Sequence, residues 1–561
     1  MQKQIQTEST ENVIADSTQV DPRRHDLDAL RAFAMLLGIV LHGAMSFIPG
    51  AGVFWGVQDS QASLFYGVLL FSIHGWRMPL FFLVSGFFTA MLWQKRGLRA
   101  VLIHRFQRIF LPLLLSMITV IPTMLLVSAY LRSQGSAAPP TTSDTEFSAA
   151  QPSSSQPEPS DINIWAAVAT DDQATLKVYL DQGGDVLAKD PYGSTPLHVA
   201  CLFGRAEAAE LLLEADADLD VLNHDGKRPE DLLQLDWVTT AFIAQMVQLS
   251  VDQEEVLAGR EEIARAIGEH TGRSVTARLE VGNKTAGGSV LFAMLFQTPV
   301  FFHLWFLWFL CWYTVGFALI VKFVRALQAP VIPDKWLTSG LRYLWLIPLT
   351  AAAQHFMASA QYAYGPDTSI GLLPLPAVFA YYAIFFGYGA LYFNASDAEG
   401  AIGRGFGWKL SLAILILFPV GLGLQGPDSV SRRILFAVMQ ASYTWVMSFG
   451  MIGLFHRFGR THRFWVRYLS DSSYWLYLVH IPLLMVFQFL VRDWPLPSFV
   501  KFVLVCAVTT ALLLLSYQLC VRNTWIGKLL NGRRYPERKT TPLGQAVVAE
   551  NTPNVLHDEN V

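Results

Sequence analysis

The sequence has few charged residues for its length. Of 561 residues only 15% are charged, whereas 52% are hydrophobic and the mean hydropathy is +0.35. A typical soluble protein has about 25% charged residues, so a wholly soluble globular chain is excluded. The net charge of −3 and the lack of a long Lys/Arg-rich tract argue against a nucleic-acid partner. We therefore expect an integral protein surrounded by membrane lipid, with a smaller polar part.

Cysteine is scarce as well. The chain has four cysteines and no CxxC pattern, so the sequence predicts no disulfide framework, no metal site and no bound cofactor. Cys201 stands alone in the polar part, and the other three fall in apolar segments. Residues 1–24 are polar, and the first apolar run, from Leu27, lacks a small-residue cleavage site. We expect that run to be retained as a membrane span.

Apolar stretches long enough to cross about 30 Å of hydrocarbon recur along the chain. They lie near 29–48, 68–92, 109–131, 301–323, 341–358, 375–394, 408–425, 433–455, 473–491 and 498–521. Lysine and arginine gather in every second loop, which predicts that both termini are cytoplasmic. The expected fold is an all-α polytopic helical bundle of about ten membrane spans.

A polar segment interrupts the apolar stretches and, on this count of spans, lies outside the cytoplasm. It opens with a Ser/Pro-rich stretch that cannot build a core. The sequence predicts these parts: a polar N-terminal tail (1–24), a first membrane part (25–131), a linker (132–160), a repeat domain (161–250), a helical or linker segment (251–298), a second membrane part (299–525) and a C-terminal tail (526–561).

The repeat domain resembles ankyrin repeats. Two copies align at a period of about 33 residues, and GSTPLHVACLFG is their diagnostic part. Thr195 and Pro196 should start a helix, and His198 is expected to be structural. Two and a half repeats are fewer than the three or so needed for independent stability. We expect residues 236–270 to cap the repeats, or the repeats to dock onto the membrane part. Such repeats would also bind a protein partner.

The first span, DALRAFAMLLGIVLHG, contains ionisable residues that are costly in a bilayer. Asp28 and Arg31 lie near one end and His42 near the other. Eleven residues turn through about 1100°, which leaves about 20°, so Arg31 and His42 share a face about 16 Å apart along the axis. Met35 and Gly38 lie between them on that face. The small Gly38 leaves room for a molecule to pass along it.

Four other segments carry further candidates. They are His74, Arg77 and Ser85 in SIHGWRMPLFFLVSGFF, Arg105 and Arg108 in HRFQRIFLP, His303 in HLWFLWFLCWY, and Tyr474, Tyr477 and His480 in SSYWLYLVHIP. Structural roles remain open for several of them. Arg105 and Arg108 fit positive-inside anchors, His303 an aromatic-belt neighbour, and His480 a histidine bonded to a carbonyl freed by Pro482. His42 is the hardest to explain structurally.

These motifs together resemble acyltransferase family 3 membrane enzymes, and within them the branch of glucan biosynthesis protein C. The resemblance covers about residues 24–132 and 299–525, with the ankyrin segment inserted between them. It implies transfer of an acyl group from a cytoplasmic acyl-CoA, a cosubstrate, to a hydroxyl of an extracytoplasmic carbohydrate or glucan. The ankyrin insertion departs from the family's usual architecture.

The resemblance also implies roles for the candidate residues. His42 would be the general base that deprotonates the acceptor hydroxyl. Arg31 would orient the donor or stabilise the oxyanion, and Arg105 with Arg108 would hold the phosphates of CoA. Two alternatives stay open at this point: a multispan transporter or channel with an ankyrin binding module, and an ankyrin scaffold with a degenerate membrane domain.

Overall fold

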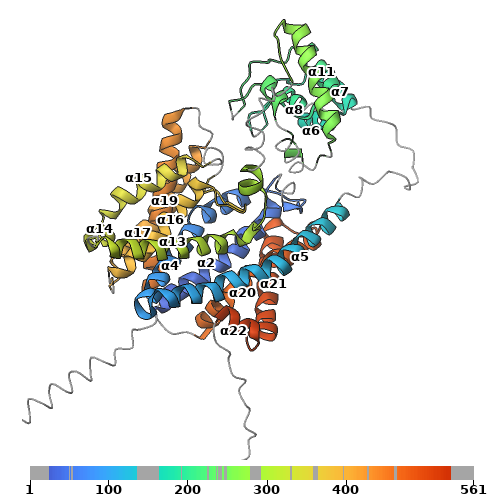
Figure 1. The fold of residues 1–561 in the computed structure, drawn as a ribbon. Coiled ribbons are helices and arrows are strands. Elements are labelled where there is room, and N and C mark those ends of the chain that lie inside the picture. The colour runs from blue at the N-terminus through green and yellow to red at the C-terminus, as the bar shows by residue number, and fades with distance from the viewer. Residues whose placement is uncertain are drawn as a thin grey trace, which may run out of the picture.

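The computed structural model contains helices and no strands in the part of the chain that it describes. It describes residues 24–49, 51, 55–135, 163–190, 192–223, 226–235, 237, 240, 243–244, 249, 251–277, 292–328, 332–357, 364–395, 397, 399–425, 429–459 and 464–531. The expected N-terminal tail up to residue 23, nearly all of the Ser/Pro-rich linker and the tail beyond residue 531 lie outside this part. Figure 1 shows the described helices, with the ankyrin helices gathered apart from the membrane bundle.

The membrane bundle is built from two stretches of chain. The first contains α2 (His25–Ala44), η1 (Met45–Phe47), α4 (Leu64–Arg105), η2 (Phe106–Phe110) and α5 (Leu111–Gly135). The second contains η5 (Ala293–Gln297), η6 (Phe302–Leu304), α13 (Trp305–Ala326), α14 (Asp334–Thr338), α15 (Arg342–His355), α16 (Pro376–Asn394), η8 (Ala401–Gly403), α17 (Phe406–Leu412), η9 (Ala413–Leu417), α18 (Phe418–Gly423), α19 (Val430–Phe458), α20 (Phe464–Val491), α21 (Ser498–Ser516), η10 (Tyr517–Val521) and α22 (Trp525–Asn531).

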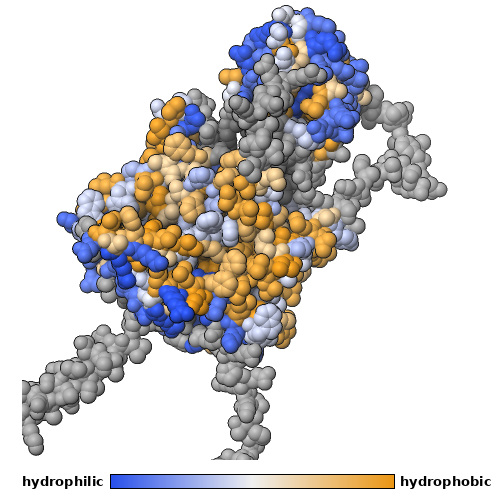
Figure 2. Space-filling model, viewed as in Figure 1, coloured by the Kyte–Doolittle hydropathy of each residue, from blue (hydrophilic) through white to orange (hydrophobic). Residues whose placement is uncertain are grey.

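Eight helical stretches of the described chain are long and apolar enough to cross a membrane. One of them, Leu64–Leu131, contains two of the predicted spans. The two are separated at Gly97, where the backbone leaves helical geometry (φ 77°, ψ 171°). The expected span at 341–358 is not among the eight, since α15 has only 14 residues. Figure 2 shows hydrophobic residues over much of the bundle and hydrophilic residues over the ankyrin part. The protein is therefore an integral membrane protein.

Close backbone packing fixes α4 against α16. A Cβ atom on Gly86 would lie 1.9 Å from the Phe386 carbonyl oxygen, and one on Gly389 would lie 1.9 Å from that of Leu83. Only glycine allows two membrane helices to approach this closely. Pro79 inside α4 has no N–H, so the carbonyl oxygen of Gly75, one turn earlier, loses its helical partner. The Thr444 hydroxyl of α19 donates to that oxygen instead, at 2.7 Å. These contacts hold the SIHGWRMPLFFLVSGFF segment in a fixed position.

The ankyrin part forms its own core. Its helices are α6 (Ile164–Ala169), α7 (Gln173–Asp181), α8 (Pro196–Phe203), α9 (Ala206–Glu214), η4 (Pro229–Gln234) and α11 (Gln253–Thr271). Thr195 caps α8 as expected, and the His198 ring contacts its hydroxyl at 2.8 Å and the Lys227 carbonyl oxygen at 3.0 Å. Burial lowers the pKa of His198, which keeps the ring neutral. The expected structural role of this histidine is confirmed.

Helix α11 caps the short repeat array. It packs against α8, α9 and η4, and Ile263 and Ile267 join the ankyrin core. The contact is close because a Cβ on Gly259 would lie 1.9 Å from the Gly204 carbonyl oxygen. Arg260 is 1% exposed and donates to the carbonyl oxygens of Leu202 and Leu235. Two ways of stabilising so few repeats were expected, a cap or docking onto the membrane part. In the described part of the chain, α11 provides the cap.

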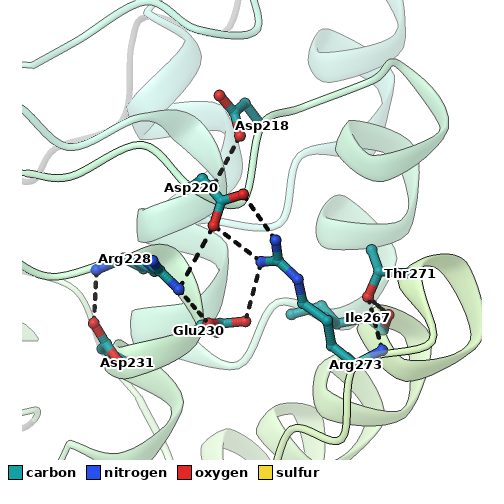
Figure 3. Close-up of polar contacts among 8 residues, drawn as sticks. All are labelled: Asp218, Asp220, Arg228, Glu230, Asp231, Ile267, Thr271 and Arg273. Atoms are coloured by element: carbon teal, nitrogen blue, oxygen red, sulfur yellow. Dashed lines mark hydrogen bonds and ion pairs between the residues drawn. The ribbon is translucent and has the colours of Figure 1, made fainter.

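A surface cluster of ion pairs ties the residues after α11 to the repeats (Figure 3). Arg273 pairs with Asp220 at 2.7 Å, and Arg228 contacts the same carboxylate at 3.6 Å and Glu230 at 3.6 Å. The hydrogen bond from Arg273 lowers the pKa of Asp220. The cluster is exposed, so each pair adds little stability. Its role is to hold the end of the cap in register with the second repeat.

Candidate functional site

A cavity of about 1560 Å³ opens among α2, α4, α13 and α20. We call it the arginine cavity, because the side chains that line it include Arg24, Arg31, Arg105 and Arg108 together with Asp28, Ser85 and Tyr474. Arg31 donates to the Ser470 hydroxyl at 3.1 Å and lies 3.5 Å from the Asp28 carboxylate. Six of the candidates named from the sequence thus border one hollow: Asp28, Arg31, Ser85, Arg105, Arg108 and Tyr474.

The two arginines of the RxxR motif are positioned by an irregular turn of helix. Residues 106–110 form a π-helix, η2, between α4 and α5. Such bulges are frequent at functional sites. The Tyr474 hydroxyl donates to the Arg108 carbonyl oxygen at 2.9 Å. Arg105 donates to the Thr89 hydroxyl at 2.6 Å, and its guanidinium carries no ion pair with a described carboxylate. The cavity therefore holds positive charge suited to an anionic ligand.

The histidine cluster, made of His42, His303, Tyr477 and His480, lies one to two helical turns beyond the cavity. Phe306, Tyr474 and Met35 line the cavity. His303 of η6 lies about one turn from Phe306, Tyr477 about one turn from Tyr474, and His42 about two turns from Met35. His42 Nδ1 lies 2.8 Å from His480 Nε2. The ring centroids of His303 and His480 are 5.7 Å apart, and the Tyr477 hydroxyl donates to the His303 carbonyl oxygen at 2.6 Å.

The carbonyl freed by Pro482 is taken by another histidine than expected. Pro482 has no N–H, so the carbonyl oxygen of Leu478 loses its helical partner. His303 Nε2 donates to that oxygen at 3.1 Å, whereas His480 Nδ1 bonds to the Tyr477 carbonyl oxygen at 2.8 Å. The interpretation that His480 bonds to the carbonyl oxygen freed by Pro482 is therefore wrong. The carbonyl that the proline frees fixes His303 of η6 instead, which gives that residue more than an aromatic-belt role.

These hydrogen bonds assign the tautomers of two neutral rings. A carbonyl oxygen only accepts, so His480 Nδ1 carries the hydrogen and its Nε2 has a lone pair. His42 Nδ1 must then donate to His480 Nε2. This leaves the lone pair of His42 on Nε2, which makes no hydrogen bond with any residue that the structure describes. A ring oriented in this way can accept a proton from a substrate hydroxyl.

An aromatic side chain covers the His42 ring. Trp55 stacks on it with centroids 5.8 Å apart and planes 8° apart. The indole N–H donates to Gln488 Oε1 at 2.7 Å, and the amide of Gln488 donates to the His42 and Gly43 carbonyl oxygens at 3.0 Å each. Trp55 and Gln488 therefore hold the end of α2 and the plane of its imidazole. Neither was singled out from the sequence.

The space beside Gly38 is occupied by a side chain. A Cβ on Gly38 would lie 2.3 Å from Arg77 Nη1 of α4, so the guanidinium presses against the α2 backbone there. The expected open path along the face from Arg31 to His42 is therefore blocked at its middle. His74, one turn along α4, contacts the Pro366 carbonyl oxygen at 2.9 Å and lines neither the cavity nor the histidine cluster.

Sequence reasoning also missed a buried ion pair. Lys501 Nζ lies 2.7 Å from Asp59 Oδ1, and the two side chains are 0% and 1% exposed. Lys501 also donates to the Arg492 carbonyl oxygen at 3.0 Å. The pair joins the segment that carries Trp55 to α21. A lysine four residues into an apolar span was a visible signal, but its partner follows only from the fold.

Comparison with known proteins places the chain in a family. A family model described as "Acyltransferase domain" matches residues 24–152 and 274–518, and one described as "Ankyrin repeats (many copies)" matches residues 179–232. The glucans biosynthesis protein C of Escherichia coli K12 and that of strain O157:H7 are each 34% identical over 104 residues, which cover 18% of this chain. The match spans only a quarter of the length of these curated relatives. No solved structure matches.

The acyltransferase model covers about two thirds of the chain, on both sides of the ankyrin segment. This match favours an enzyme over a transporter, a channel or a scaffold with a degenerate membrane domain. It also includes the helices that carry the arginine cavity and the histidine cluster. The chain belongs to acyltransferase family 3, and ankyrin repeats are inserted within its acyltransferase domain.

Proposed function

We propose that the protein transfers an acyl group from a cytoplasmic acyl-CoA to a hydroxyl group of an extracytoplasmic carbohydrate. The observation that carries this proposal is that the arginine cavity and the histidine cluster follow one another along the same helical bundle. The arginine cavity offers guanidinium groups to phosphates, and about two turns along α2 from its lining residue Met35 the His42 ring has a free nitrogen. A glucan is the first acceptor to test, because the relatives are glucans biosynthesis proteins.

In the proposed reaction His42 acts at the acceptor and the arginine cavity at the donor. His42 Nε2 takes the hydroxyl proton, and the oxygen attacks the thioester carbonyl carbon. The C–S bond then breaks, and the CoA thiolate takes the proton back from His42. Arg105 and Arg108 hold the phosphates, for which planar guanidinium groups are well suited. Arg31, fixed by Ser470 and Asp28, orients the donor within the cavity.

Replacing both RxxR arginines should weaken donor binding selectively. Hydrogen bonds to charged groups contribute about 1.5–3 kcal/mol each, so Arg105→Ala with Arg108→Ala should raise KM for acyl-CoA about tenfold or more. KM for the carbohydrate should stay nearly constant. The measurement is acyl transfer by the purified protein in proteoliposomes. Arg99→Ala, an exposed arginine of the same segment that does not line the cavity, is the matched control. Equal effects of all these variants would favour simple positive-inside anchoring.

The proposal also includes an orientation, with both termini in the cytoplasm and the ankyrin segment outside. The lysines and arginines in every second loop support the orientation, and helix-end contacts agree with the count of spans: Asp26 at the start of α2 meets His456 near the end of α19 at 3.1 Å, and Asp59 before α4 meets Lys501 at the start of α21. Each pair joins ends that the ten-span count puts on one side. Placed outside, the repeats would hold an envelope protein or the acceptor near the site.

Thiol labelling of intact cells tests this orientation. A single cysteine at Ser154, in a Cys201→Ser background, should react with a membrane-impermeant maleimide before the cells are permeabilised. A cysteine placed at Asn531, the end of α22, serves as the control and should react only afterwards. The reverse order would put the repeats in the cytoplasm and remove them from acceptor capture.

A further inference from the structure

Arg77 lies beside the proposed base, deep in the bundle. Its side chain extends from α4 onto α2, where Nη1 would lie 2.3 Å from a Cβ on Gly38. Gly38 and His42 are four residues apart, so they follow one another on the same face of α2. Arg77 is only 8% exposed. The guanidinium therefore sits between the arginine cavity and the histidine cluster, next to the place where the acyl group must be transferred.

The charge of this guanidinium is not matched by an acid. No described carboxylate forms an ion pair with Arg77, and its buried Nε makes no hydrogen bond with a described residue. The positive charge of Arg77 interacts electrostatically with His42, His74 and His480. The groups that favour the charged form of Arg77 are the hydroxyls of Tyr382 and Tyr477. A buried cation without an anion is costly. It marks a position where a negative charge forms or binds.

The other arginines are too far away to meet a charge that forms at His42. Arg31 lies eleven residues before His42, about 16 Å along the helix axis, and is held by Ser470 and Asp28 at the far end. Arg105 is bonded to Ser85 and Thr89, which lie about two and about three turns from Arg77 on α4. Among the described arginines that face the site, Arg77 alone is within one helical turn of the base.

We infer that Arg77 is a catalytic residue that donates hydrogen bonds to the oxyanion of the tetrahedral intermediate. This inference rests on the proposed function. When the acceptor oxygen bonds to the thioester carbon, the electron pair of the C=O bond moves to its oxygen, and the proton goes to His42. The oxyanion then lies between the guanidinium and the new imidazolium. Collapse restores the C=O bond, releases the thiolate and returns the proton to it. Arg31 keeps only its role in orienting the donor.

Replacing Arg77 tests this role through the rate rather than through binding. Removing one oxyanion donor typically lowers kcat about 10²–10³-fold, so Arg77→Gln should lower kcat to that extent while KM for acyl-CoA changes less than about threefold. Arg77→Lys should recover only part of the loss, because lysine lacks the planar fork. The melting temperature of both variants should be unchanged or higher, since no acid partner is left unpaired. An arginine that merely supports packing would lower it.

A second variant moves the guanidinium without removing it. Gly38→Ala places a methyl group 2.3 Å from Nη1, so it should lower kcat about tenfold or more. Gly67→Ala, also on a membrane helix but with open space around its new methyl group, is the matched control and should keep the wild-type rate. Equal rates in the two alanine variants would overturn the inference.

The donors used in the assay separate an oxyanion from a permanent negative charge. An acetyl thioester and one with a dicarboxylic acyl chain should lose kcat equally in Arg77→Gln. A loss confined to the dicarboxylic donor, or one expressed only as a raised KM, would overturn the inference, because Arg77 would then bind the substrate's own carboxylate. Near-normal kcat would overturn it as well. If the wild-type protein transfers no acyl group from either thioester, the proposed function itself fails, whatever Arg77 does.

Discussion

His42→Ala should reduce acyl transfer by about 10²–10⁴-fold, the contribution typical of a general base. The substitution removes the Nε2 lone pair that faces no described partner, while His480 keeps its bond to the Tyr477 carbonyl oxygen. The rate is measured with acyl-CoA and a carbohydrate acceptor in proteoliposomes, and thermal unfolding in detergent checks the fold. His355→Ala, at the end of α15 and outside both sites, is the matched control.

Substitutions of His480 should also lower the transfer rate, because His480 accepts the hydrogen bond that orients the His42 ring. His480→Phe removes the acceptor for His42 Nδ1 and should lower kcat, since the imidazole then loses its fixed tautomer. His480→Gln retains an amide oxygen that accepts the same hydrogen bond, and it should recover part of the rate. Full activity in His42→Ala would remove the histidine cluster from the chemistry. Equal losses in the two His480 variants would reduce that residue to packing.

Lys501→Met should destabilise the fold strongly by stranding a buried carboxylate. Lys501 and Asp59 are almost fully buried, and Asp59 Oδ2 has no hydrogen-bond partner among the described residues. Removing one member of a buried pair typically costs about 3–5 kcal/mol. We expect a clearly lower melting temperature in detergent, measured by thermal unfolding, and a lower transfer rate, because the segment that holds Trp55 over His42 loses its anchor.

A double substitution separates the stranded charge from a general loss of packing. Asp59→Leu together with Lys501→Met removes both charges, and this exchange is often neutral or stabilising. The double variant should therefore melt well above Lys501→Met alone. Lys528→Met, an exposed lysine of α22, is the matched control and should melt like the wild type. A double variant no more stable than the single one would show that the pair is not the source of the effect.

The sequence predicted those features that depend on neighbours along the chain. Helical spacing was enough to put Arg31 and His42 on one face, and a repeat period of about 33 residues was enough to identify the ankyrin segment. The expected span at 341–358 was not found, because only 14 of its residues are helical. Hydropathy averages over such a stretch cannot show where a short helix ends.

The contacts that define the site could not be predicted, because they depend on how distant helices are rotated. Gly38 was correctly seen as an open position, but Arg77 of another helix fills it. Pro482 was correctly seen to free a carbonyl, but a histidine 175 residues away takes it. Trp55 and Gln488 are 433 residues apart and share one hydrogen bond. Residues 236–270 were expected either to cap the repeats or to leave them docked on the membrane part, and only the packing of α11 on α8 and α9 decides for the cap.

The place of Arg77 against Gly38 has an electrical consequence. A cavity of about 1560 Å³ shortens the distance over which a membrane protein must exclude ions. If water fills such a cavity, protons and sodium ions can enter it. A fixed positive charge at the narrow end of an aqueous pathway repels such cations, as it does in water-conducting pores. The guanidinium pressed onto the α2 backbone supplies that charge beside Gly38, between the arginine cavity and the histidine cluster. A positive charge at that position opposes the passage of protons and sodium ions from the hollow toward the histidines.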